Sequence, residues 1–243
     1  MKFLGIIPAR YASTRLPGKP LALIHGKPMI QQVYERVKQS NTVDKIIIAT
    51  DDKRIINAAN SFGAEAILTS PLHNSGTERC AEVAAAIGIN FDVIINIQGD
   101  EPFIEKDHLQ LLHDLFLNEE IHIGSLIKKI LSLDELKNPN VVKSVKSSEG
   151  KALYFSRAVV PYLRNIEESE WLNHHSFYKH IGLYGYRLET LLKIAQLAPT
   201  PLEQAESLEQ LRWLENNFNI HLAETLIETL SIDTLEDLTK ANK

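Results

Sequence analysis

Runs of consecutive apolar residues alternate with helix-like patterns through the first half of this 243-residue chain. Two of these runs, 46–48 and 93–95, contain only isoleucine and valine. A strand that is apolar on both faces is covered on both, which is typical of a parallel sheet with helices on either side. Between such runs the apolar positions recur with helical spacing, as in 28–38. The sequence therefore predicts an α/β fold built from βαβ units.

The pattern predicts the following elements in chain order. Strands are expected at 3–9, 45–50, 64–68, 92–97, 123–130, 141–146, 152–156, 181–186 and 220–224. Helices are expected at 28–38, 52–62, 77–87, 106–117, 133–138, 188–197, 202–216 and 235–241. The polar stretch 165–176 indicates an exposed excursion. No repeat or linker divides the chain, so we expect one domain over 1–243, with an inserted lobe at roughly 122–186.

Composition excludes several classes of protein. A net charge of −5 argues against a nucleic-acid binder that relies on overall positive charge. Cys80 is the only cysteine, so no intrachain disulfide can form. No apolar run approaches the ~20 residues that span a bilayer. The first strand begins almost at Met1, with no signal-peptide pattern, so we expect a cytoplasmic protein without membrane contact.

A basic loop follows the first predicted strand. Residues 6–20 read IIPARYASTRLPGKP, so the strand leads directly into two arginines and a lysine. Guanidinium groups bind phosphate through paired hydrogen bonds, and a lysine ammonium adds a point charge. Arg10, Arg15 and Lys19 therefore predict a polyphosphate site, the alternative being a solvated basic loop. The segment is not a Walker A loop, because Lys19 is followed by Pro20.

An acidic segment follows the strand predicted at 92–97. It reads Gln98-Gly99-Asp100-Glu101-Pro102. Ligands of open α/β sheets lie outside the carboxyl ends of the strands, the edge where the basic loop is also expected. Mg²⁺ is usually held by one or two carboxylates together with phosphate oxygens. Asp100 is therefore a predicted Mg²⁺ ligand, unless the segment is simply a turn that ends at the proline.

Two further groups of candidates have structural explanations. Asp233 or Thr234 can cap the last helix, and capping is the more frequent role for such residues. Ser75 or Thr77 can likewise cap the helix predicted at 77–87. Alternatively, their loop presents hydroxyls, backbone amides and an arginine to a nucleotide. The residues alone leave both explanations open and favour capping.

Cations and histidines also mark the second half of the chain. Arg157 ends a short apolar strand, and Lys179 and His180 begin another. They predict either a basic pocket for an acidic small molecule or ordinary surface pairs. His174 and His175 form no known metal-binding pattern, and we expect them on the surface.

Eight segments, in order along the whole chain, resemble the 3-deoxy-manno-octulosonate cytidylyltransferases (CMP-Kdo synthetases) of Gram-negative bacteria. They are 7–20, 49–51, 75–79, 98–102, 152–157, 180–187, 208–212 and 233–238. The resemblance implies a nucleotide-diphospho-sugar transferase-like (Rossmann-like) fold with a mixed, mostly parallel sheet. It implies a Mg²⁺-dependent transfer of CMP from CTP to the anomeric hydroxyl of Kdo, with release of pyrophosphate. It further implies a homodimer that serves lipopolysaccharide biosynthesis.

The resemblance also assigns roles to individual residues. Those implied to bind the nucleotide are Ala9, Arg10, Ser13, Arg15, Lys19, Ser75, Thr77, Arg79 and Gln98. Those implied to bind the sugar are Arg157, His180, Tyr184, Glu209 and Gln210. The implied catalytic residues are Arg15, Lys19 and Asp100. Asp100 and Asp233 are the implied Mg²⁺ ligands. For Asp233, the resemblance therefore favours metal binding over helix capping.

The chain departs from the family pattern in places. Residues 228–232 replace a glycine-rich stretch, Leu235 replaces a proline, and 201–207 keeps only part of the pattern. Two alternative functions follow. One is a cytidylyltransferase for another acidic sugar, such as 8-amino-Kdo or sialic acid. The other is a non-catalytic cytidine-nucleotide sensor, which should lack one metal carboxylate, whereas both candidates are present here.

Overall fold

The computed structural model describes residues 1–12, 16–228 and 230–242. Within these ranges nine strands form one sheet in the order β11-β7-β10-β6-β1-β4-β5, with β8 and β9 attached through β10. The strands are β1 (Phe3–Ala9), β4 (Lys45–Thr50), β5 (Ala66–Leu68), β6 (Val93–Asn96), β7 (Ile123–Lys129), β8 (Lys143–Lys146), β9 (Ala152–Ser156), β10 (Tyr178–Arg187) and β11 (Ile220–Thr225). A separate small hairpin consists of β2 (Leu23–Ile24) and β3 (Lys27–Pro28).

The centre of the sheet is parallel. β1 pairs in parallel with β4 and β6, and β4 pairs in parallel with β5. β10 is the long exception, because it runs antiparallel to both β6 and β7. The predicted mixed, mostly parallel α/β sheet is confirmed. Because β1 and β6 are adjacent and parallel, the loops that follow them leave the sheet at one edge.

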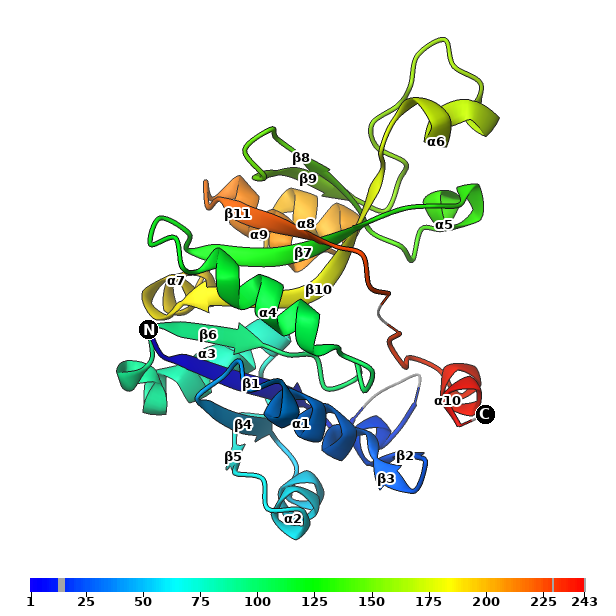
Figure 1. The fold of residues 1–243 in the computed structure, drawn as a ribbon. Helices are drawn as coiled ribbons and strands as arrows, with labels where there is room; N and C mark the ends of the chain where they lie inside the picture. The colour runs from blue at the N-terminus through cyan, green and yellow to red at the C-terminus, as the bar shows by residue number, and fades with distance from the viewer. Residues whose placement is uncertain (13–15, 229, 243) are drawn as a thin grey trace.

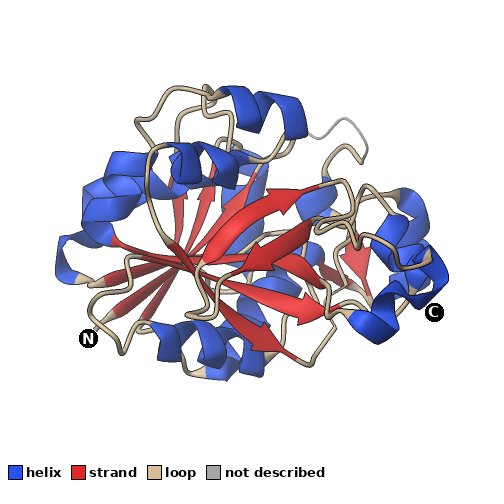
Figure 2. Ribbon diagram, turned by 90° about the horizontal axis from the view of Figure 1, so that it is seen from above, coloured by secondary structure: helices blue, strands red, loops and turns tan. Residues whose placement is uncertain are grey.

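Helices cover both faces of the twisted sheet (Figures 1 and 2). They are α1 (Met29–Ser40), α2 (Lys53–Ser61), α3 (Gly76–Ile87), α4 (Lys106–Leu115), α5 (Leu133–Lys137), α6 (Trp171–His174), α7 (Leu188–Ile194), α8 (Pro201–Glu206), α9 (Glu209–Glu215) and α10 (Leu235–Ala241). α1 and α4 belong to one apolar core with β1 and β6, and α3, α7 and α9 belong to another on the opposite face. The buried strand residues alternate between the two cores, as expected for a sheet covered on both sides.

One expectation for the second half needs correction, and a second needs an addition. The single helix expected at 202–216 is two helices, because Ser207 adopts a left-handed conformation (φ 52°) that ends α8. The polar stretch 165–176 is largely exposed, but it contains α6, whose Trp171 is buried against Phe177. Within the range of the expected lobe, β7 and β10 belong to the large sheet, whereas α5 and α6 project from it (Figure 1).

The last segment of the chain returns to its first third. After β11 it runs to α10, which packs beside the β2–β3 hairpin (Figure 1). Ile232 and Ala241 are buried against Ile24 and Met29. This packing carries Asp233 across the molecule to the edge where the basic loop lies. No helix in the described ranges is both long enough and apolar enough to cross a bilayer.

Candidate active site

The basic loop and the acidic segment meet at Lys19. Its ammonium lies 2.7 Å from an oxygen of Asp100 and 2.8 Å from an oxygen of Asp233. The Lys19 side chain is 11% exposed, whereas the two carboxylates are about one-third exposed. Asp100 is 81 positions from Lys19 in the sequence, and Asp233 is 214 positions from it. The fold nevertheless brings all three side chains together at the carboxyl ends of β1 and β6. Water can reach both carboxylates, so they are accessible to a ligand.

A glycine allows the acidic segment to approach β1 closely. A Cβ atom on Gly99 would lie 2.8 Å from the Pro8 carbonyl oxygen, closer than such atoms come in proteins. The absence of a side chain at Gly99 thus lets the turn after β6 pack on the end of β1. Because Asp100 follows directly, this close approach brings its carboxylate to Lys19.

Asp233 is not the helix cap. Thr234 caps α10: its hydroxyl accepts from the Asp237 amide (3.2 Å), and Asp237 accepts in return from the Thr234 amide (2.9 Å). The Asp237 carboxylate also accepts from the Asp233 amide (3.1 Å), and the Ile232 amide donates to the Asp100 carbonyl (2.9 Å). These backbone contacts fix the segment while the Asp233 carboxylate turns toward Lys19.

A cavity of about 270 Å³ surrounds this point. We call it the first cavity. Its lining residues include Ala9, Arg10, Lys19, Ser75, Arg79, Gln98, Asp100 and Asp233, all of which are candidates from the sequence. Two cations, Arg10 and Lys19, and two carboxylates thus face one space, a composition suited to a polyphosphate with a metal ion. Two further candidates, Ser13 and Arg15, lie outside the described residues.

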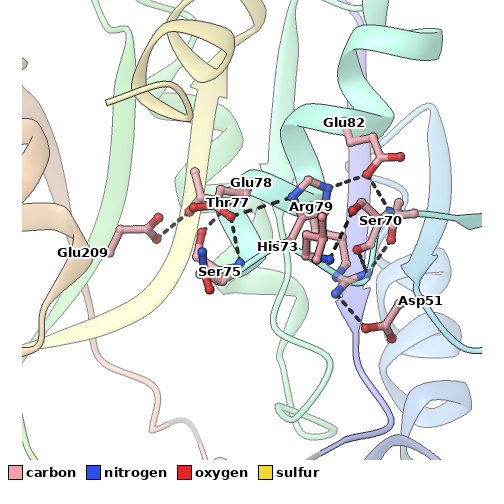
Figure 3. A network of polar contacts seen from close by, with 12 residues as sticks. Asp51, Ser70, His73, Ser75, Thr77, Glu78, Arg79, Glu82 and Glu209 are labelled. Carbon is pink, nitrogen blue, oxygen red and sulfur yellow. Dashed lines mark hydrogen bonds and ion pairs between the residues drawn. The ribbon is translucent and has the colours of Figure 1, made fainter. Parts of the chain in front are cut away.

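Arg79 forms part of the wall of the first cavity. Its guanidinium donates to the Thr69 hydroxyl and the Ser70 carbonyl, and it pairs with Asp51 at 3.2 Å (Figure 3). The residue is only 4% exposed. A buried guanidinium with so many acceptors is held in one orientation. Arg79 therefore braces loop 69–76, one side of the cavity.

His73 also lines the first cavity, although no sequence pattern points to it. Its Nε2 contacts the Glu82 carboxylate, and Glu82 accepts from the Ser70 amide at 2.9 Å. Glu78 accepts from the Asn74 amide at 2.8 Å (Figure 3). Glu78 and Glu82 of α3 thus hold the loop that precedes α3 in place through hydrogen bonds. A lone histidine outside any metal-binding pattern gives no signal that sequence reasoning could use.

A second cavity of about 210 Å³ adjoins the first. We call it the second cavity, and it shares Gly76 and Gln98 with its neighbour. Its other lining residues are Thr77, Asn96, His180, Gly182, Tyr184, Glu209, Gln210 and Trp213. None of these carries the fixed positive charge of a lysine or arginine. The two cavities therefore meet along the N-terminus of α3 and the end of β6.

His180 is a neutral group in the second cavity. Burial lowers the pKa of its imidazole to about 3, so the ring is uncharged at neutral pH. It lies 3.1 Å from the Ser125 hydroxyl and contacts the rings of Phe155 and Tyr184. A register shift between Ile181 and Tyr184 interrupts the pairing of β10 with β7 beside it. The neutral imidazole can donate or accept a hydrogen bond but supplies no charge.

Three residues of the second cavity carry polar atoms without partners among the described residues. They are the side-chain oxygen of Asn96, the hydroxyl of Tyr184 and the indole nitrogen of Trp213. Asn96 and Trp213 are at least 98% buried, and Tyr184 is 6% exposed. An unpaired buried polar atom is costly, so each of these atoms is a candidate partner for a bound ligand. Asn96 and Trp213 have no sequence signature, because each lies within an apolar pattern.

The break at Ser207 sets the position of Glu209 and Gln210. The Glu206 carboxylate accepts from the Ser156 hydroxyl (2.6 Å) and the Arg157 amide (2.9 Å), which ties the end of α8 to the end of β9. The chain then turns and begins α9 with Glu209. Glu209 and Gln210 consequently stand at the N-terminus of α9, where they line the second cavity.

Arg157 lies outside both sets of lining residues. Its guanidinium donates to the carbonyls of Glu206 (2.7 Å), Pro139 (3.1 Å) and Ser207 (3.3 Å). These contacts stabilise the turn between α8 and α9. The structure therefore separates Arg157 from the other sugar-site candidates, and its role toward a sugar carboxylate stays a prediction.

The residues at Lys19 fit a divalent ion. One ammonium contacts both Asp100 and Asp233, so the two carboxylates already converge on a single cation. In the described ranges no group of three or more His, Cys, Asp or Glu side chains forms a metal centre. Two carboxylates alone suit Mg²⁺ when phosphate oxygens and waters complete its coordination. These two carboxylates could therefore hold a metal ion that arrives with a nucleotide.

The chain is similar to known proteins along its whole length. The cytidylyltransferase family model matches residues 4–226. A 3-deoxy-manno-octulosonate cytidylyltransferase of Parabacteroides distasonis is 52% identical over 245 residues, which cover 99% of this chain and 97% of the relative. A protein of the same name from Phocaeicola vulgatus is 49% identical, with 99% and 96% covered. Among solved structures, a CMP:2-keto-3-deoxy-manno-octonic acid synthetase complexed with CTP is 42% identical, with a TM-score of 0.91 over 100% of this chain and 97% of that one.

Proposed function

This chain belongs to the cytidylyltransferase family, and we propose that it transfers CMP from CTP to the anomeric hydroxyl of Kdo, releasing pyrophosphate. Full-length relatives about half identical to it carry that activity in their names. The observation that carries the proposal is that two cavities with different linings adjoin each other. One is lined by cations and paired carboxylates, the other by neutral hydrogen-bonding groups, and they meet at Gly76 and Gln98.

The first cavity supplies charge neutralisation for the triphosphate. An anionic sugar must approach a nucleotide with about four negative charges, so repulsion has to be screened before the hydroxyl attacks. Arg10 and Lys19 provide fixed positive charge where the phosphates would lie, with the end of β1 as a rigid base. Attack forms an oxygen–phosphorus bond at the α-phosphate and breaks the bond to pyrophosphate. Positioning and electrostatics account for most of the rate enhancement in such transfers.

We infer that Asp100 and Asp233 hold Mg²⁺ when CTP is bound. Their convergence on one ammonium supports this assignment. The ion would neutralise phosphate charge and lower the pKa of the sugar hydroxyl. Lys19 would then exchange its carboxylate contacts for contacts with the phosphates, since its three protons can serve either set of oxygens.

The second cavity suits the hydroxyl-rich body of a sugar acid. Glu209, Gln210 and His180 offer acceptors and donors, and Tyr184 and Trp213 offer apolar ring surface. Sugar hydroxyls need such directional partners, because only paired polar groups compensate for lost water. Arg157 is the proposed partner of the sugar carboxylate, a role for which it must first release carbonyl contacts of the turn after α8.

The remaining assignments extend the same proposal. Kdo is a component of lipopolysaccharide, so its activation serves that biosynthesis. We propose a cytoplasmic homodimer that acts on small molecules, without nucleic acid or membrane as partners.

The decisive experiment measures pyrophosphate release with CTP, Mg²⁺ and Kdo, and with each omitted in turn. We expect release only when all three are present. Parallel reactions with 8-amino-Kdo and sialic acid test the sugar specificity. A preference for either of these sugars would overturn the assignment of Kdo, and a lack of release with any sugar acid would overturn the activity.

A further inference from the structure

Thr77 belongs to the second cavity rather than the first. Its family resemblance implies a nucleotide contact, yet it lines the second cavity and is 2% exposed. Its hydroxyl donates to a carboxylate oxygen of Glu209 at 2.7 Å. In Figure 3 Thr77 faces Glu209, whereas Arg79 turns the other way, toward Asp51. A hydroxyl has a single proton, so Thr77 cannot also donate to a nucleotide.

Glu209 depends on this hydrogen bond. The carboxylate is partly buried at the start of α9. Arg212 of the same helix does not pair with it, because its guanidinium binds Glu203 at 2.5 Å and 2.7 Å. A carboxylate in such surroundings needs donors to stay ionised and in one orientation. Thr77 supplies one from α3, the helix whose N-terminus forms the wall between the cavities.

The charges around Glu209 determine how it titrates. Burial raises its pKa, and the hydroxyls of Thr77 and Ser75 lower it, with a smaller lowering by Arg212 and a small raising by Glu203. Other ionisable groups around it are Cys80 of α3, Tyr184 and Tyr186 of β10, and His180, which lines the same cavity; all are neutral at physiological pH. Removal of the Thr77 hydroxyl therefore raises the pKa of Glu209 further.

We propose that Thr77 is a positioning residue for sugar recognition, holding the Glu209 carboxylate as an oriented acceptor for hydroxyl groups of the sugar acid. This inference rests on the proposed function, since it assigns the second cavity to the sugar. It assigns Thr77 a role in sugar binding in place of the nucleotide contact that the family resemblance implies. It also makes α3 a shared element, with loop 73–76 facing the first cavity and Thr77 facing the second.

The test is a set of matched substitutions assayed by pyrophosphate release. Thr77→Val keeps the shape and removes the hydroxyl, and Thr77→Ser keeps the hydroxyl. Thr190→Val is the control, because Thr190 is a similarly buried threonine (6% exposed) on α7 outside both cavities. Thermal unfolding of all variants separates folding losses from recognition. KM is measured for Kdo and for CTP, each across pH 5 to 8.

We expect Thr77→Val to raise KM for Kdo about tenfold, as for a lost hydrogen bond to a charged group, with KM for CTP within about twofold. Thr77→Ser, which keeps the hydroxyl, should have the wild-type KM for Kdo. The rise of the Kdo KM toward low pH should begin at a higher pH in Thr77→Val than in wild type. It should be absent in Glu209→Gln, where a second change at Thr77 should add little.

Three results would overturn the inference. Thr77→Val could raise KM for CTP rather than for Kdo, or it could equal Thr190→Val in every measurement. The third is that the effects of Thr77→Val and Glu209→Gln on KM for Kdo are fully additive in the double variant. These are separate from failure of the proposed function, in which wild-type protein itself releases no pyrophosphate from CTP and Kdo.

Discussion

The two cavities share a wall but differ in how they can hold a ligand. The first is lined by the cations Arg10, Lys19 and Arg79 together with two aspartates. The second is lined by rings, amides and a neutral imidazole, with Glu209 as its carboxylate. Charges act over several ångströms and tolerate small shifts, whereas hydrogen bonds to hydroxyls need exact directions. Accordingly, the first cavity is assembled from loops and the second largely from β10 and α9.

This difference predicts which substitutions are severe. Loss of a charge in the first cavity should affect the chemical step itself, because it leaves phosphate charge unscreened. Loss of a hydrogen bond in the second should affect the affinity for one substrate.

The largest effect is expected at Asp100. We predict that Asp100→Ala lowers kcat/KM by about 10³-fold, equivalent to about 4 kcal/mol, since a metal ligand and a partner of Lys19 are both lost. The measurement is pyrophosphate release as a function of Mg²⁺ concentration. Asp107→Ala, at an exposed aspartate in the first turn of α4, is the matched control and should remain fully active. Normal turnover by Asp100→Ala at millimolar Mg²⁺ would exclude the metal role.

The meeting of the basic loop and the acidic segment follows from general rules. Apolar runs such as 46–48 indicate a parallel sheet, and the carboxyl ends of parallel strands share an edge. Lys19 and Asp100 could therefore be expected on the same side without knowledge of the strand order. The Lys19–Asp100 contact agrees with that expectation. Local sequence patterns were sufficient here because the sheet itself imposes the geometry.

Long-range contacts explain what the sequence did not reveal. The amphipathic pattern of 202–216 is continuous, and the break at Ser207 depends on Glu206 binding β9, fifty residues away in sequence. Similarly, the residues alone favour Asp233 as a helix cap. Only the packing of Ile232 and α10 against the β2–β3 hairpin turns its carboxylate to Lys19.

The neutral state of His180 in the folded protein should make the stability of the fold decrease at acid pH. Its pKa is lowered by burial from 6.5 to about 3, so the unfolded chain binds a proton at higher pH than the folded protein. The stability of the fold is therefore complete above pH 6.5 and falls as the pH decreases toward 3. We predict that His180 accounts for about 2 kcal/mol of lost stability between pH 7 and pH 5.

Urea unfolding at both pH values tests this prediction. Between pH 7 and pH 5, His180→Asn should lose about 2 kcal/mol less stability than wild type, and His174→Asn, at an exposed histidine, should lose as much as wild type. A His180→Asn variant whose stability changes with pH as in wild type would show that folding does not lower the pKa of His180. The contrast between a charged and a neutral cavity would then fail.

A smaller effect is expected at Asp237, which touches the first cavity only through Asp233 and Thr234. Asp237→Ala removes half of the capping box and should cost about 1 kcal/mol of stability. It should also raise the Mg²⁺ concentration needed for half-maximal activity about tenfold, because the backbone of Asp233 loses an acceptor. Glu236→Ala, at an exposed neighbour, is the control. An unchanged Mg²⁺ requirement would separate the cap from the metal site.

The smallest effect is expected at Ser207, and it tests how the second cavity is built. Glycine adopts φ 52° without steric cost but loses more entropy on folding, so Ser207→Gly should change stability by less than about 0.5 kcal/mol and leave KM for Kdo unchanged. Ser207→Val should cost about 1–2 kcal/mol, because a branched side chain strains a left-handed residue. If the valine variant matched the glycine variant in both stability and KM, the left-handed turn would not be what positions Glu209. The directional contacts of the second cavity would then have to come from β10 alone.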